Sequence, residues 1–482
     1  MASESGNFLQ YHELGIIEIL IAVSFFTFLS LGEYISSKII RANIIGSIVV
    51  GIIYGVPLAN ILPSAWQETF LALGYIGLIL IIFEGGLTAR LDLLRANFLL
   101  SLCGATTGVI LPISFSYLLL YLGFGYGAVE TFIIGAALSA TSLGTTFAVI
   151  SGASKEVDLS QTRVGAVLVS AAVIDDVTGL VMLSVIHDLG SLSGGGSANL
   201  GWLIGRPVLA SALMAILTPV LSKWVFAPFF RRYIERRFAK YDHFSNIILM
   251  TLVLSAFVSI AAYAGTSVLF GAFLAGSFLT YLPSKHPEGP FVVLSREQGE
   301  KEKSKSPTFV HTFECYLLDA LQYVLGPLFF ASIGFAIPFL DLWTGDAIWR
   351  GVVYTLVMLV GKLLVGTWVL AWQFFSTPKD DEKQLITSNS RSDEKNSGSR
   401  MSGSLEPALL LGFAMVARGE IGLLIVQIGY NDTSYVSEAG FLTAIWAILL
   451  NTIIGPVVVG LLVKYFGKRI SKGAWGLVEN NQ

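Results

Sequence analysis

Two adjacent aspartates are the strongest candidates in this sequence for functional chemistry. Asp175 and Asp176 lie in the run SAAVIDDVTGL, near the middle of the apolar segment 163–187. Side chains at positions i and i+1 of a helix point about 100° apart, so one can face a cavity while the other meets a neighbouring helix. Two such carboxylates cannot both ionise cheaply in a low dielectric. The pair predicts a site where protons and a hard cation such as Na⁺ compete for oxygens; a paired structural charge is the alternative.

Further ionisable residues also fall inside apolar segments. Lys362 lies in LVGKLLVG, Arg418 and Glu420 lie in AMVARGEIGLL, and Glu84 lies in IIFEGGL near a segment end. An ionisable group at the centre of a bilayer costs at least ~2.5–3.5 kcal/mol, so each is a candidate functional residue. A buried lysine readily loses its proton, and we expect a neighbouring aspartate to keep Lys362 protonated until a cation arrives. A permanent salt bridge that only fixes packing is the alternative interpretation.

Two segments have polar interruptions at their centres. Gly419 separates Arg418 from Glu420, and the run SATSLGTT places Thr141 and Ser142 inside another segment. Broken helices near the midplane of a membrane can bind ions through freed carbonyls and half-helix ends. Small polar residues also pack ordinary helix interfaces, so both interpretations of the second run stay open.

The composition identifies the elements that must position these residues as membrane helices. The chain of 482 residues is 54% hydrophobic and 13% charged, with a mean hydropathy of +0.72. Soluble proteins carry about 25% charged residues, so a soluble enzyme and a disordered protein are excluded. The net charge of −3 gives no indication of a nucleic-acid partner. With only Cys103 and Cys315, neither a disulfide framework nor a cysteine zinc site is expected.

Apolar segments of about 20 residues, long enough to cross ~30 Å of hydrocarbon, predict thirteen transmembrane helices. Loops that follow the odd-numbered segments contain 26 of the 30 Lys and Arg residues. The positive-inside rule therefore predicts an outside N-terminus and a cytoplasmic C-terminus, in either a plasma or an organelle membrane. The predicted segments are 14–33, 43–62, 67–86, 97–121, 127–150, 163–187, 200–222, 244–263, 265–282, 315–340, 348–374, 405–429 and 437–464.

The polar ends and loops complete the predicted organisation. Residues 1–13 form the outer N-terminus, 14–464 the membrane domain and 465–482 a cytoplasmic tail. Residues 284–312 and 376–404 are rich in Ser, Lys, Glu and Asp and are predicted to be disordered cytoplasmic loops. The second loop is a candidate for phosphorylation, although a solvated linker explains the same composition.

The order of the segments predicts an internal repeat. The fourth to sixth segments and the eleventh to thirteenth each comprise a helix, an interrupted helix and a long helix, and charged residues occur in both groups. An offset of seven segments reverses the orientation, so the two groups would be inverted repeats whose interrupted helices cross. We expect these six segments to form an ion-binding core.

At these residues the chain resembles the monovalent cation:proton antiporter superfamily, specifically its NapA-like Na⁺/H⁺ antiporter branch. The resemblance implies an all-α homodimer in which a core domain moves against a dimerisation domain by an elevator-like shift. It also implies a role in pH homeostasis, with membrane lipids as partners and no cofactor besides the transported ions. The motifs are ATSLGTT at 140–146, VIDDVTGL at 173–180, GPLFFASIGFAIP at 326–338, GKLLVG at 361–366 and ARGEIGLL at 417–424.

The same resemblance implies roles for individual residues. Asp176 would be the main carboxylate for Na⁺ and protons, and Asp175 would be its neighbour, paired with Lys362 in the ion-free state. Thr141, with Ser142, would lie in the first interrupted helix, and Glu420, with Arg418, in the second. The Asp-Asp pair resembles the electrogenic subgroup, whereas FEGGL at 83–87 resembles the electroneutral branch.

Other functions remain as alternatives. A K⁺/H⁺ antiporter of the same fold is the nearest, and a channel is a second. An intramembrane aspartyl protease would need its two aspartates on separate helices, and a prenyl transferase would need carboxylates that recur at i+4. The sequence favours neither enzyme.

Overall fold

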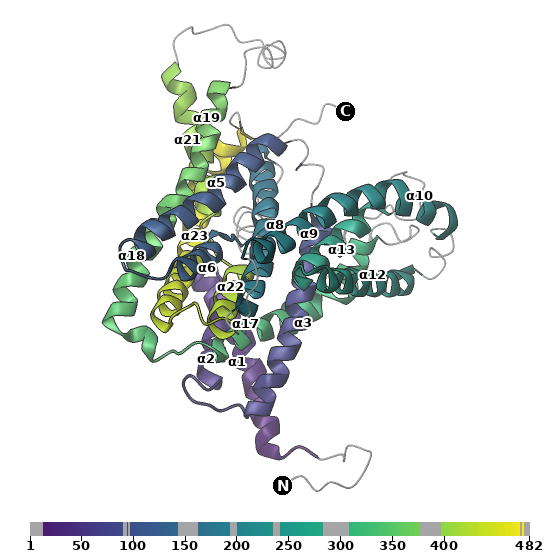
Figure 1. The fold of residues 1–482 in the computed structure, drawn as a ribbon, viewed down its shortest axis with the longest axis vertical. Helices are drawn as coiled ribbons and strands as arrows, with labels where there is room; N and C mark the ends of the chain where they lie inside the picture. The colour runs from purple at the N-terminus through teal and green to yellow at the C-terminus, as the bar shows by residue number, and fades with distance from the viewer. Residues whose placement is uncertain are drawn as a thin grey trace.

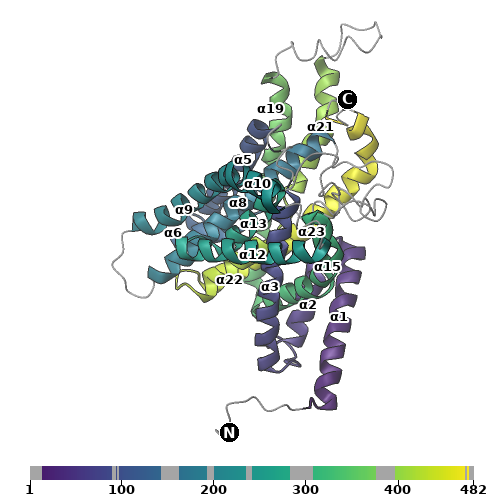
Figure 2. The same cartoon turned by 90° about the vertical axis from the view of Figure 1, so that its right-hand side faces the viewer.

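The structure, a computed structural model, is built from helices. It describes residues 13–89, 94, 97–142, 162–192, 200–234, 242–282, 308–375, 397–472 and 475–476. Within these ranges every regular element is a helix, as the sequence predicts for an all-α membrane protein. Figure 2 shows α1, α2 and α3 extending toward one end of the molecule, and α19 and α21 extending toward the opposite end.

The helices in the first half of the chain are α1 (Ile16–Ile40), α2 (Asn43–Tyr54), α3 (Ser64–Thr88), α5 (Phe98–Ser116), α6 (Ala128–Ser139), α8 (Arg163–Leu192), α9 (Leu200–Leu221), α10 (Ala227–Phe229) and α12 (Asp242–Ala264). Those in the second half are α13 (Val268–Tyr281), α15 (Phe309–Tyr316), α16 (Leu318–Ala320), α17 (Gly326–Phe335), α18 (Gly345–Leu363), α19 (Thr367–Phe375), α21 (Ser397–Ala414), α22 (Glu420–Asn431) and α23 (Glu438–Lys472). Short π-helical turns continue α5, α9 and α10 and precede α17.

Each of the thirteen predicted segments overlaps at least one of these helices. Within the described part of the chain, nine helices are long and apolar enough to cross a membrane, and four shorter helices are also apolar. The multi-pass all-α class is therefore confirmed, whereas the number thirteen stays a prediction.

The predicted polar regions differ from the structure at their edges. Most of 284–312 and 376–404 lies outside the described residues, but 309–312 begin α15 and 397–404 begin α21. Residues 465–472, predicted as tail, continue α23. In each case the helix extends beyond the apolar segment, because backbone hydrogen bonds do not require an apolar side chain at every position.

Two groups of helices pack internally. Helices α1, α2, α3, α12, α13 and α17 contact one another, and α5, α6, α8, α18, α21, α22 and α23 form the second group. Figure 1 shows α9, α10, α12 and α13 on one side of the molecule and α5, α18, α21 and α23 on the other. The second group contains every residue that the sequence singles out except Glu84, which lies on α3.

Two helices of the second group are interrupted; each interruption is called a helix break, or break, below. Helix α6 ends at Ser139, and Ala140 continues with extended backbone angles. Helix α21 ends at Ala414, and α22 begins only at Glu420. The predicted interruption at 405–429 is confirmed, and the chain leaves the helical conformation at 140–142. Residues 143–150 lie outside the described residues.

Candidate ion-binding site

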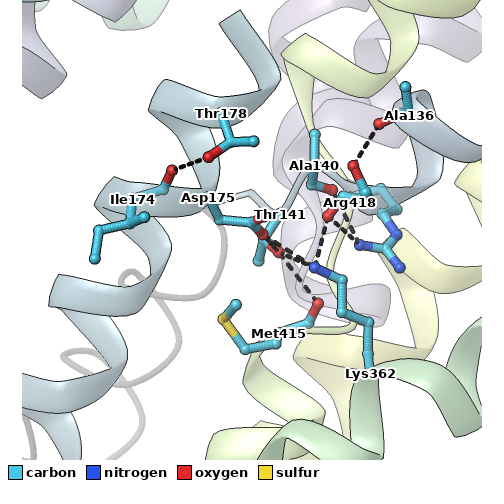
Figure 3. A network of polar contacts seen from close by, with 10 residues as sticks. Ala136, Ala140, Thr141, Ile174, Asp175, Thr178, Lys362, Met415 and Arg418 are labelled. Atoms are coloured by element: carbon cyan, nitrogen blue, oxygen red, sulfur yellow. Dashed lines mark hydrogen bonds and ion pairs between the residues drawn. The ribbon is translucent and has the colours of Figure 1, made fainter. Parts of the chain in front are cut away.

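Asp175 is a completely buried carboxylate on α8. Its side chain is 0% exposed. One oxygen, Oδ2, accepts a hydrogen bond from the Thr141 hydroxyl and another from the Lys362 ammonium at 3.0 Å. Figure 3 shows the three side chains converging from the break after α6, from α8 and from α18. The expected pairing of Asp175 with Lys362 is thus present as a buried ion pair.

Lys362 uses its full donor capacity in this contact. Its Nζ lies 2.6 Å from the Ser139 carbonyl oxygen, 2.9 Å from Thr141 Oγ1 and 3.0 Å from Asp175 Oδ2. An ammonium has three N–H donors, so all three have partners. The Ser139 carbonyl belongs to the C-terminal end of α6, where the helix dipole favours a positive charge. Lys362 is therefore held by a carboxylate and a half-helix end together.

Arg418 supports the same half-helix end from the second break. Its guanidinium is buried, and Nη1 donates to the Ala140 carbonyl oxygen at 3.0 Å. The Arg418 carbonyl in turn accepts from Thr452 Oγ1 on α23 at 3.0 Å. Among the described residues, Nε and Nη2 of Arg418 have no hydrogen-bond partner. Arg418 thus brings a second positive charge to the end of α6.

The two breaks are joined directly. The Ser142 amide donates to the Ala417 carbonyl oxygen at 2.9 Å, and Thr141 Oγ1 lies 3.4 Å from the Met415 carbonyl oxygen. A Cβ added at Gly419 would lie 2.7 Å from Ser142 Oγ, so glycine permits this close approach. Backbone groups that leave the helical hydrogen-bond pattern at each break therefore find partners at the other.

Asp176 has different surroundings from its neighbour. Its side chain is only partly buried, and it makes no hydrogen bond to the residues that the structure describes. Its charged neighbours are Glu420, Asp175 and Lys362. Glu420, at the first position of α22, is also partly buried. Asp176 and Glu420 thus form an acidic region beside the buried ion pair.

Two buried oxygens in this region, Asp175 Oδ1 and Ser142 Oγ, have no hydrogen-bond partner among the described residues. No group of three His, Cys, Asp or Glu side chains within the described ranges is arranged to hold a metal ion. A cation here would therefore combine carboxylates with hydroxyl, carbonyl or water oxygens, which suits a hard monovalent ion.

The structure brings together all seven candidate residues that the sequence identifies: Thr141, Ser142, Asp175, Asp176, Lys362, Arg418 and Glu420. Glu84 makes none of these contacts and instead has Glu314 as a charged neighbour. Sequence reasoning missed the Ser139, Ala140 and Met415 carbonyls, because no side-chain type signals a main-chain acceptor.

Comparisons with known proteins identify the family of the chain. The transmembrane sodium/hydrogen exchanger family matches residues 19–465. The chain is 28% identical over 445 residues to the Na⁺/H⁺ antiporter of Enterococcus hirae. This alignment covers 92% of this chain and 96% of that protein. It is 24% identical over 424 residues to the Na⁺/H⁺-K⁺ antiporter GerN of Bacillus cereus, covering 88% and 90% respectively.

A solved structure shows the same fold. The sodium proton antiporter MjNhaP1 from Methanocaldococcus jannaschii superposes with a TM-score of 0.55 at 18% identity, covering 93% of this chain and 97% of that one. The resemblance to the monovalent cation:proton antiporter superfamily is confirmed by the family match. The chain belongs to the sodium/hydrogen exchanger family of transmembrane transporters.

Proposed function

We propose that this protein exchanges Na⁺, or Li⁺, for protons across a membrane, with Asp176 as the principal carboxylate and with net movement of charge. The strongest support is the buried Asp175–Lys362 ion pair next to a partly exposed Asp176 at the meeting point of two broken helices. The relatives that match most of this chain are named as Na⁺/H⁺ or Na⁺/H⁺-K⁺ antiporters, and these names support the same transported ions.

The proposed mechanism is a competition for the aspartate oxygens. Where the pH is high, Asp176 releases its proton and Na⁺ binds to the free carboxylate. Cation binding draws in Asp175, which leaves Lys362, and Lys362 then loses its proton because a buried ammonium without a counter-charge is costly. Two protons move against one Na⁺, so one net charge crosses, coupled to voltage at ~2.3 kcal/mol per 100 mV.

Alternating access would come from relative movement of the two helix groups. In this proposal α5, α6, α8, α18, α21, α22 and α23 form the moving core, and the group around α1, α3 and α13 forms the dimerisation domain. The core contains the whole site, so a rigid shift would carry the site across without breaking the contacts between the two helix breaks. The chain would act as a homodimer, with an outside N-terminus and a cytoplasmic C-terminus.

K⁺/H⁺ exchange by the same site is the second candidate. One observation favours it: GerN, which matches 88% of this chain, is described as a Na⁺/H⁺-K⁺ antiporter. The oxygens around Asp176 are common to both candidates, because Na⁺ and K⁺ are both hard cations that differ in size and in preferred ligand number.

Proteoliposomes that hold a pH gradient test both candidates. Na⁺, Li⁺ and K⁺ are added in turn, with the membrane voltage either clamped or free, and proton movement is followed with a pH-sensitive dye. We expect Na⁺ and Li⁺ to dissipate the gradient at a rate that depends on voltage. A response to K⁺ alone would transfer the site to the second candidate, and no response to any cation would reject exchange.

A further inference from the structure

Trp475 and Gly476, which follow α23, contact the helix that carries the two aspartates. Helix α23 ends at Lys472, and Trp475 and Gly476 follow in a turn. Trp475 is 2% exposed, although it lies in the segment 465–482 that the sequence predicts as a cytoplasmic tail. It packs in an apolar cluster with residues of α5, α8, α19, α21 and α23, which includes Leu100, Val164, Val167, Leu168, Val369, Leu411 and Ile470.

Main-chain hydrogen bonds attach the same turn to the first residues of α8. The Arg163 amide donates to the Gly476 carbonyl oxygen at 2.9 Å, and the Val164 amide donates to the Trp475 carbonyl oxygen at 3.3 Å. The first four N–H groups of a helix have no partner within that helix. Two of the four in α8 are therefore capped by a segment more than 300 positions away in sequence, as the residue numbers show.

A charge contact adds to this attachment. The Arg163 guanidinium lies over the Trp475 indole, with its central carbon 5.0 Å from the ring centroid. Such a cation–π contact favours one orientation of both side chains. Trp475 and Gly476, defined here as the tail clasp, thus hold the start of α8 by apolar burial, by two main-chain hydrogen bonds and by a cation–π contact.

The tail clasp contacts the first turn of α8, the helix that also carries the two aspartates. Asp175 follows Arg163 by twelve residues, or about 18 Å along the helix axis. The other contacts of Asp175, with Thr141 and Lys362, come from α6 and α18. The position of the aspartates relative to those partners therefore depends on how α8 is anchored at its first turn.

We propose that the tail clasp positions α8, so that the end of the chain sets the affinity of the aspartates for the transported cation. Trp475 is a positioning residue, since it reaches the site only through α8. The inference rests on the proposed exchange function for its kinetic readout. Its structural readout, protection of the Arg163 and Val164 amides, does not depend on any transport activity.

Hydrogen–deuterium exchange on the full chain tests the contact itself. Trp475→Ala is compared with the parent protein and with Trp475→Phe, which keeps an aromatic ring for the apolar cluster. We expect peptides that begin before residue 161, and so retain the Arg163 and Val164 amides, to lose protection in Trp475→Ala and to regain most of it in Trp475→Phe. Unchanged protection in Trp475→Ala would overturn the inference, whether or not the protein exchanges ions.

Transport kinetics test whether the contact positions the site. Chains that end at residue 472, without the tail clasp, and at residue 478, with it, are compared in proteoliposomes at matched protein content. We expect the shorter chain to have a KM for Na⁺ about fivefold higher with a similar maximal rate, the size of change expected for loss of one helix cap. Trp475→Ala should likewise raise the KM for Na⁺ without changing the maximal rate, and Trp475→Phe should have a KM close to that of the parent protein.

The remaining outcomes each count against positioning. Equal KM values for the two truncated chains would overturn the inference even if amide protection is lost. So would a fall in maximal rate at constant KM, since that is the result of losing folded protein. If the parent chain shows no exchange, the proposed function fails instead, and the amide protection still reports on the tail clasp.

Discussion

Asp175 and Asp176 have the same side chain and adjacent positions, but they face two different regions. Asp175 is 0% exposed and is fixed by Thr141 and Lys362. Asp176 is partly exposed, makes no hydrogen bond to the described residues and has Glu420 as a neighbour. The 100° between consecutive helical side chains is enough to place one carboxylate in a packed ion pair and the other in an acidic, accessible region.

In the proposed mechanism, this difference assigns two steps to two residues: binding of the cation, and coupling of that binding to a second charge. In the proposed exchange, the carboxylate that binds and releases ions is Asp176, which is partly exposed and has no hydrogen-bond partner among the described residues. A carboxylate that links ion binding to a second charge must hold that charge in the ion-free state, as Asp175 holds Lys362. The comparison therefore predicts that equivalent changes at the two positions have unequal effects.

The largest expected effect comes from Asp176→Asn. We expect this variant to lose exchange completely, because the amide neither releases a proton nor supplies a charged oxygen to Na⁺. Asp175→Asn serves as the matched variant and should keep measurable, weaker exchange. Rates in proteoliposomes at saturating Na⁺ distinguish them, and preserved exchange in Asp176→Asn would reverse the assignment of the two residues.

Lys362→Gln is expected to have the second largest effect. Removing one partner of a buried ion pair typically costs about 3–5 kcal/mol, so the melting temperature in detergent should fall. Exchange that persists should lose its dependence on voltage, because the second proton no longer has a carrier. The double variant with Asp175→Asn should regain much of the stability. A single variant that keeps the full voltage response would contradict the role given to Lys362.

Gly419→Ala is expected to disturb the contact between the two breaks. The new Cβ would meet Ser142 Cβ and Oγ at 2.7 Å, so the breaks must move apart at a cost of ~1–3 kcal/mol. Gly85→Ala on α3 is the control, because nothing lies within 4 Å of its added Cβ. Thermal unfolding should show a lower midpoint for Gly419→Ala only. Equal midpoints would mean that the breaks tolerate separation.

Thr141→Val is expected to have the smallest effect of these variants. It removes a hydrogen bond that Asp175 accepts and Asp176 does not. The change removes a hydroxyl that donates to Asp175 and accepts from Lys362 at 2.9 Å, at similar side-chain volume. One hydrogen bond contributes about 1 kcal/mol, so the KM for Na⁺ should change by roughly fivefold. Thr141→Ser should behave as the parent protein. An unchanged KM in Thr141→Val would remove Thr141 from the site.

Much of this site follows from side-chain type alone. Asp175, Asp176, Lys362 and Arg418 are conspicuous because charges are costly in apolar segments, and the break at Gly419 is visible as a polar interruption. The backbone acceptors of Lys362 and Arg418 have no such signal, because any residue type supplies a carbonyl. Their position depends on how two distant breaks meet.

The tail clasp is a second feature that the local sequence does not predict. Trp475 lies in the predicted tail 465–482, ten residues after Tyr465, where its position fits no periodic apolar pattern. It is buried in an apolar cluster with residues of α5, α8, α19, α21 and α23. Local sequence therefore predicts a tail, whereas the contact with the first turn of α8 becomes visible only in the folded chain.

The voltage at which exchange stops tests the central claim most directly. Proteoliposomes with a tenfold Na⁺ gradient and no pH gradient are held at a series of potassium–valinomycin potentials, and net proton flux is recorded. If Asp176 and Lys362 together carry two protons against one Na⁺, flux should reverse at ~59 mV. A net flux that does not respond to voltage would mean one proton per Na⁺ and would contradict the role proposed for the Asp175–Lys362 pair.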